Sequence, residues 1–269
     1  MSLTDEQITN LFRVLDRSRP DRLPHPRVLT STLSSICFPP QRGVMSQTQL
    51  SYFMTASVEM WHRALHSFLI AASLYRASEL WASVAGYYAS HYSMRAFAHL
   101  FGFFALYRRR AFLEASFAGG RCQCVPVASL PNGSRREHRF YWTVVRQQQR
   151  FQGDDLFTDN DEGRDESDAS HRGYANYVDH IDRFGDYNSC DREELRGKVA
   201  QIIRTAIDGA IAIPDRRNYP DVATVLAVGY LRIRRYRALL DELLGTRGRF
   251  WRYHRSPTWS EGLVAFPTQ

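Results

Sequence analysis

Two histidines and one arginine recur at intervals of four residues within a long apolar stretch of this chain. If residues 79–104 are helical, His91, Arg95 and His99 lie on one face of that helix. Imidazole groups exchange protons near neutral pH, and guanidinium groups bind anions. The face is either a buried polar network that fixes helix register or the lining of a functional pocket. The buried network is the interpretation that we favour from the sequence.

Arginine supplies almost all of the positive charge. The 269 residues contain 35 Lys and Arg against 28 Asp and Glu, a net charge of +7, and Lys198 is the only lysine. An anionic partner fits this balance. Two clusters are candidate nucleic-acid contacts, because the planar arginine fork matches phosphate geometry: Arg108, Arg109 and Arg110, and Arg232, Arg234 and Arg235. The alternative for each cluster is a solvated helix surface.

The sequence predicts neither a metal nor a cofactor. Cys37, Cys122, Cys124 and Cys190 lack the paired spacing of a zinc site. Residues 153–168 hold eight acids and one arginine, but their spacing does not fit an EF-hand. No phosphate-binding glycine loop or dinucleotide fingerprint occurs. We interpret the acidic loop as solvated; a second hypothesis is that it covers a basic groove and mimics a polyanion.

The N-terminal region predicts one clear helix. Residues 4–19 carry an apolar stripe, and Thr4 followed by Gln7 three positions later is a capping box. A proline-rich connector follows, and within it residues 28–38 fit either a helix or an extended arm.

Two long helices should follow and form an antiparallel pair. Residues 46–74 present a wide apolar face, with Ser46 or Thr48 as the cap. The stretch 79–104 follows after a short connection, which is why we expect an antiparallel pair. Residues 111–117 are expected to continue as a further helical turn or two.

From Gly119 onward the sequence pattern changes from one typical of helices to one typical of strands. Residues 121–130 and 135–149 predict two strands around the turn Asn132-Gly133. Apolar periodicity predicts later helices at 174–184, at 192–213 and at about 219–244, the last of which ends at Gly245.

These elements predict a mainly α-helical, multi-helix bundle with an inserted β-hairpin and acidic loop. The expected organisation is an N-terminal helix and arm (1–45), a long helical hairpin (46–117), the insertion (118–190), and C-terminal helices with a basic aromatic tail (191–269). The polar residues in the middle of 80–106 favour burial in protein over membrane insertion. The N-terminus is not a signal peptide, so a cytoplasmic protein is expected.

The run YYASHYSMRAFAHLFG, residues 87–102, resembles the second long helix of HEPN-type domains. Those helices carry an aromatic pair, small residues, an alanine-rich middle and a closing glycine. The order of elements is also similar, since an Arg-led motif opens the final helix there and Arg217-Asn218 stands at that place here. The resemblance covers about one helix and one helix start.

The resemblance implies that residues 46–245 form one dimerising HEPN-like domain, of a kind common in bacterial toxin–antitoxin, antiviral defence and RNA-processing systems. Active members cut RNA without metal through Arg-x(4–6)-His, with the histidine in proton transfer and the arginine stabilising phosphate charge. This chain departs from the pattern, because no histidine follows Arg217 at 222–224. The spacing recurs at Arg249 and His254 in the tail.

The leading hypothesis is therefore an RNA-associated protein, and a metal-independent ribonuclease if it is catalytic. Its phosphate-binding or electrostatic groups would be Arg217 and Arg95, and its acid–base groups His91, His99 or His254. Asn218, which follows Arg217 in the Arg-Asn opening, is a further candidate site residue. The alternatives are a non-catalytic adaptor of a larger assembly and, lower, a DNA-binding regulator. Expected partners are RNA or another nucleic acid, and a second copy or a protein partner, with no membrane.

Overall fold

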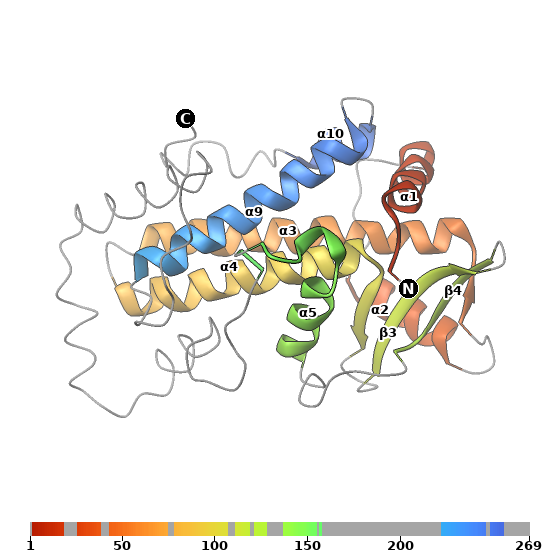
Figure 1. The fold of residues 1–269 in the computed structure, drawn as a ribbon, viewed down its shortest axis with the longest axis horizontal. Helices are drawn as coiled ribbons and strands as arrows, with labels where there is room; N and C mark the ends of the chain where they lie inside the picture. Colours follow the sequence, from red (N-terminus) through yellow and green to blue (C-terminus); the bar gives the residue numbers. More distant parts are fainter. Residues whose placement is uncertain are drawn as a thin grey trace. The chain divides into compact units, whose positions relative to one another are not determined.

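The computed structural model describes residues 2–18, 26–38, 43–74, 78–106, 111–118, 121–127, 137–154, 156–157, 222–245 and 248–255 (Figure 1). Several predictions lie outside these residues. They are the helices at 174–184 and 192–213, the Asn132-Gly133 turn, most of the acidic loop, and the candidate site residues Arg108, Arg109, Arg110, Arg217 and Asn218.

The chain divides into two compact units, each assembled from separated parts of the sequence. Unit 1 comprises Met1–Trp61, Met94–Gln152 and Tyr236–Pro257, and unit 2 comprises His62–Ser93, Gly153–Arg235 and Thr258–Gln269. Helices α3 (Gln47–Leu74), α4 (Glu79–Leu100) and α9 (Val222–Leu244) contribute residues to both units. The described residues are mainly helical with a small antiparallel sheet, which confirms the predicted fold class.

The predicted helix starts in unit 1 are confirmed by their caps. In α1 (Asp5–Ser18), the Gln7 amide donates to Thr4 Oγ1 and the Thr4 amide donates to Gln7 Oε1. Ser46 and Gln49 form the same reciprocal pair before α3, so Ser46 is the cap. Each box satisfies two amides that the first helical turn leaves without partners. The undecided stretch in the connector is helical, as α2 (Pro26–Cys37).

A four-stranded antiparallel sheet lies in unit 1, with strand order β1-β4-β3-β2. Its strands are β1 (Val44–Met45), β2 (Phe103–Leu106), β3 (Ala111–Ala118) and β4 (Arg121–Pro126). A hairpin is present, but it joins β3 to β4 and not the two segments 121–130 and 135–149 that the sequence predicted as its strands. Residues 111–117 are a strand and not a helical continuation.

The second predicted strand, at 135–149, is wrong: this region contains helix α5 (Glu137–Arg146) and the 3-10 turn η2 (Gln149–Phe151). Phe140, Tyr141, Val144 and Val145 are buried, a spacing of one and four that places them on one helical face.

Helix α4 ends at Leu100, four residues before the expected end. Gly102 has a φ of +90°, and the amide of Ala115 donates to its carbonyl at 2.7 Å. A Cβ at position 102 would lie 2.8 Å from the Ala115 oxygen. Only glycine therefore fits this turn, which leads α4 into β2 and fixes the helix beside the sheet.

The core of unit 1 packs on both sides of this sheet. On one face, Phe104 lies 4.8 Å from Phe53 of α3, measured between ring centroids. On the other face, Phe112 lies 4.4 Å from Phe140 of α5. Deeper in the unit, Ser57 donates to the carbonyl of Ala96 at 2.7 Å and receives the Tyr236 hydroxyl proton at 2.5 Å. These three buried partners join α3, α4 and α9.

In unit 2, parts of α4 and α9 approach closely at two glycines. A Cβ on Gly229 would lie 3.3 Å from the backbone oxygen of Gly86, so the helices contact almost backbone to backbone. Phe68 of α3 packs on Tyr230 of α9 at 5.2 Å. No helix among the described residues combines the length and apolarity that a membrane span requires.

Candidate functional site

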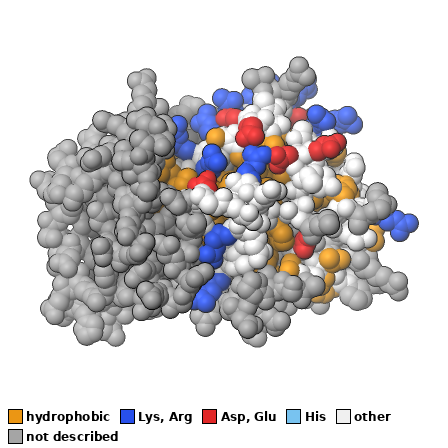
Figure 2. All heavy atoms as spheres, in the orientation of Figure 1, with side chains coloured by type: hydrophobic (Ala, Val, Ile, Leu, Met, Phe, Trp, Pro, Cys, Tyr) orange, Lys and Arg blue, Asp and Glu red, His pale blue; other side chains and the backbone are white. Residues whose placement is uncertain are grey.

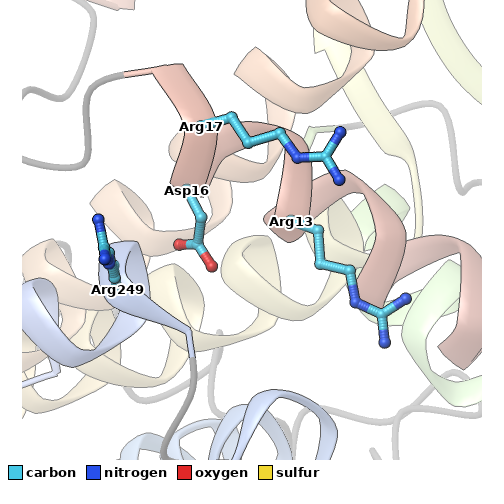
Figure 3. Close-up of a pocket in the computed structure, with 4 residues that line it drawn as sticks. All are labelled: Arg13, Asp16, Arg17 and Arg249. Atoms are coloured by element: carbon cyan, nitrogen blue, oxygen red, sulfur yellow. The ribbon is translucent and has the colours of Figure 1, made fainter.

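A pocket of about 500 Å³ lies between α1 and helix α10 (Arg249–His254) in unit 1. Its described lining residues are Arg13, Asp16, Arg17 and Arg249 (Figure 3). The three arginines are exposed and Asp16 is half-buried. Arg13, Asp16 and Arg17 share one face of α1 because they are three and four residues apart. Arg249 enters from a segment more than 230 residues later in the chain.

Contacts between and around the two helices hold this pocket together. Phe12 of α1 and Phe250 of α10 are both buried, with ring centroids 6.0 Å apart. The Asp16 carboxylate accepts the Phe250 amide proton at 2.7 Å, which ties the first turn of α10 to α1. The indole N–H of Trp251 donates a hydrogen bond to the Asp241 carboxylate at 2.7 Å, which joins α10 to α9 as well. The helices are thus fixed by contacts that leave the arginines exposed.

The side chains of this lining are of the types that can bind an anion. Among the described residues of the lining, three guanidinium groups and one carboxylate give a charge of +2. Guanidinium is charged at every physiological pH and presents a planar fork that matches phosphate or carboxylate. One oxygen of the Asp16 carboxylate already accepts the Phe250 amide proton, so part of the hydrogen-bonding capacity of this carboxylate is used within the protein. Figure 2 shows Lys and Arg side chains interspersed with Asp and Glu side chains over the described part of this face.

His99, a predicted acid–base group, is buried in unit 1 against aromatic rings. Its ring stacks on Phe104 at 4.9 Å and meets Tyr141 edge-on at 5.5 Å. Its Nδ1 is 2.8 Å from the carbonyl oxygen of Phe103, so Nδ1 carries the proton and donates it. Burial, with the nearby Arg95 charge, lowers the pKa of His99 from 6.5 to about 3. At neutral pH this side chain is neutral and packed, which does not suit proton transfer.

Arg95 also belongs to this structural cluster. Its guanidinium carbon lies 5.0 Å from the centroid of the Tyr141 ring, within the range of a cation–π contact. The positive charge of Arg95 is one reason why His99 stays unprotonated. Arg95 and His99 therefore form a partly buried network with Tyr141, in agreement with the interpretation that the sequence favoured for these two residues.

His91, the third polar residue of the α4 face, lies in unit 2. It is buried, and its ring is nearly parallel to that of Tyr87 at 6.1 Å and tilted against Tyr92 at 5.7 Å. These contacts are those of a packed helix residue.

Arg249 and His254 carry the Arg-x(4)-His spacing on α10, yet they project in different directions. Five residues on an α-helix correspond to about 140° of rotation. Arg249 is exposed in the pocket, whereas His254 is buried against Phe250, with ring centroids 4.5 Å apart. The spacing alone does not bring the two groups to one substrate atom.

The α9 arginines differ among themselves. Arg232 is completely buried and donates from Nε to the carbonyl of Leu156 at 2.8 Å, so it does not present its charge to a nucleic acid. Arg235 is exposed and pairs with Asp154 at 3.5 Å. Arg234 is exposed and lies 5.9 Å from the Tyr230 ring. The described start of the acidic segment thus contacts two of the predicted nucleic-acid arginines within unit 2.

Sequence reasoning missed Arg13, Asp16 and Arg17, and it noted Arg249 only for its distance from His254. The available signal was the exposed, basic side of the amphipathic α1. Among the described residues, no group of three or more His, Cys, Asp or Glu side chains could hold a metal ion.

The described residues define a mainly helical protein with a small antiparallel sheet and an arginine-lined pocket in unit 1. Comparison with protein-family models, with curated proteins and with solved structures finds no match to this chain.

Proposed function

We propose that this chain is an RNA-associated, HEPN-like helical protein of a bacterial defence or toxin system, and that the pocket of Arg13, Arg17 and Arg249 contacts RNA phosphates. The observation that carries the proposal is the exposure of three arginines around one cavity. The arginine-rich composition and the HEPN-like run at 87–102 agree with it. In this proposal the protein works in the cytoplasm, where RNA is available, as a homodimer or with a protein partner.

Binding is better supported than cleavage. A metal-independent ribonuclease needs a proton-transfer group at the scissile phosphate. His91, His99 and His254 are all buried among aromatic rings, and none lines the pocket. This observation favours the second candidate, a non-catalytic RNA-binding adaptor, over the nuclease.

The binding proposal is tested by titrating a fluorescently labelled single-stranded RNA dodecamer at several salt concentrations. The variant Arg13→Gln/Arg249→Gln removes two pocket charges. The matched control Arg121→Gln/Arg139→Gln removes two exposed arginines elsewhere in unit 1. The slope of log affinity against log salt should fall by about 1.4 in the pocket variant, because each lost phosphate contact is worth about 0.7 on a single strand. Equal losses in both variants, or no RNA binding by the wild type, would refute the proposal.

Cleavage is tested separately by incubating the protein with mixed RNA in EDTA. A nuclease would produce fragments that disappear when His91, His99 and His254 are replaced together. Intact RNA, with the arginine-dependent binding retained, would support the adaptor.

A further inference from the structure

Tyr253 is an exposed aromatic residue on α10, the helix that contributes Arg249 to the arginine pocket. Its side chain is 62% exposed, the highest value among the described large apolar and aromatic residues that are exposed. Tyr253 follows Arg249 by four residues on α10, so the two side chains leave the helix on the same side. The Tyr253 ring meets His254 nearly edge-on, with an angle of 81° between the planes and 5.0 Å between centroids.

The helix that displays Tyr253 is held firmly. The other face of α10 carries Phe250, Trp251 and His254, all buried. Trp251 packs edge-on against Trp61 at 5.3 Å and donates a hydrogen bond to Asp241. A tyrosine on such a support binds a flat ligand at low cost in conformational entropy, because its own side chain has only two rotatable torsions.

We propose that Tyr253 is a base-stacking subsite, and that the ligand is a nucleotide unit whose phosphate binds in the arginine pocket while its base stacks on the tyrosine ring. The inference rests on the proposed function, since it assigns a second contact to the same RNA. Bases offer a π-face whatever their identity, so the subsite tolerates different sequences. In a duplex interior both faces of a base are already stacked, and the subsite therefore takes an unpaired or terminal nucleotide.

A pure phosphate pocket would bind any flexible polyanion equally well. Stacking adds a term that depends on the presence of the base and on the aromatic ring of residue 253. The two contributions can be separated, because an abasic strand keeps every phosphate and removes every base.

The test compares a labelled uridine dodecamer with an abasic dodecamer of equal phosphate number, by fluorescence anisotropy. Tyr253→Ala should weaken binding of the uridine strand by roughly fivefold to a hundredfold, the range for loss of one stacked base. It should leave the abasic strand unchanged. Tyr253→Phe, which keeps the ring, should behave as the wild type. Tyr52→Ala is the control, since Tyr52 is a second exposed tyrosine of unit 1 and lies on α3.

The outcomes separate the two proposals. If Tyr253→Ala leaves uridine binding intact, or weakens both strands alike, the stacking subsite is refuted, while the proposed function stands as long as Arg13→Gln/Arg249→Gln still reduces binding. If neither strand binds the wild type at low salt, both proposals fail. Because Tyr253 is exposed, its variants should keep the circular dichroism and thermal midpoint of the wild type.

Discussion

Replacing His99 with asparagine tests whether this histidine is a neutral structural residue or a titrating functional one. The native imidazole donates from Nδ1 to the Phe103 carbonyl. The amide nitrogen of asparagine branches at the same point of the side chain and can donate to the same oxygen, but it does not titrate. The variant loses ring contacts with Phe104 and Tyr141, so its absolute stability will be lower than that of the wild type. The informative quantity is the change in stability with pH.

The sign and size of that change follow from the pKa of His99. Folding lowers this pKa from 6.5 to about 3, so the unfolded state binds a proton more readily than the native state. Above pH 6.5 neither state is protonated and the residue makes no pH-dependent contribution. Between pH 6.5 and about 3, acid favours unfolding by about 1.4 kcal/mol per pH unit. At pH 5 the accumulated loss is about 2 kcal/mol relative to pH 7.

Urea unfolding of both proteins at pH 7 and pH 5 measures this loss. Groups that titrate identically in the two proteins cancel, so the wild type should lose about 2 kcal/mol more than His99→Asn. Equal losses would show that the native histidine is not held neutral. An NMR titration that places the His99 pKa near 6.5 would refute the same reasoning directly and would restore His99 as an acid–base candidate.

Two further substitutions test the pocket and the turn after α4. Asp16→Asn raises the pocket charge from +2 to +3 while its amide oxygen still accepts the Phe250 amide proton, so RNA should bind several-fold more tightly at low salt in the anisotropy titration, with little change in thermal midpoint. Gly102→Ala should cost about 2 kcal/mol or more in urea unfolding, because its Cβ would clash with the Ala115 oxygen at a φ of +90°. Gly153→Ala is the control, with a φ of +78° and open space around the new Cβ, and should cost about 1 kcal/mol.

Local signals in the sequence were enough for the helices that carry both a cap and a stripe. Thr4 and Ser46 each begin a helix through a reciprocal pair with a glutamine three residues later. The signal is local because both partners lie within one turn. Gly245, with a φ of +57°, likewise ends α9 where the sequence placed its end.

Longer-range packing decided the elements that the sequence misassigned. Residues 111–117 contain small and apolar residues that suit a helix as well as a strand, and their pairing with β2 and β4 makes them a strand. In α5, Phe140 and Tyr141 are neighbours that both face the core, which a helix allows and a half-buried strand does not. The residues within either segment do not show which strands or core residues the segment will pack against.

The arginine pocket shows the same limit at the level of the site. The sequence drew attention to His91, Arg95 and His99 because regular spacing on one helix is visible in one dimension. The pocket instead depends on Asp16 reaching the Phe250 amide, a contact between residues 234 positions apart. Because α1 and α10 each bury an apolar face, the charged residues on their other faces meet only after folding. Of the residues that regular spacing selected, His91 and His99 are buried and Arg95 is half-buried, whereas Arg13, Arg17 and Arg249 of the pocket are exposed. Solvent exposure, which spacing on one helix does not show, therefore separates the two groups.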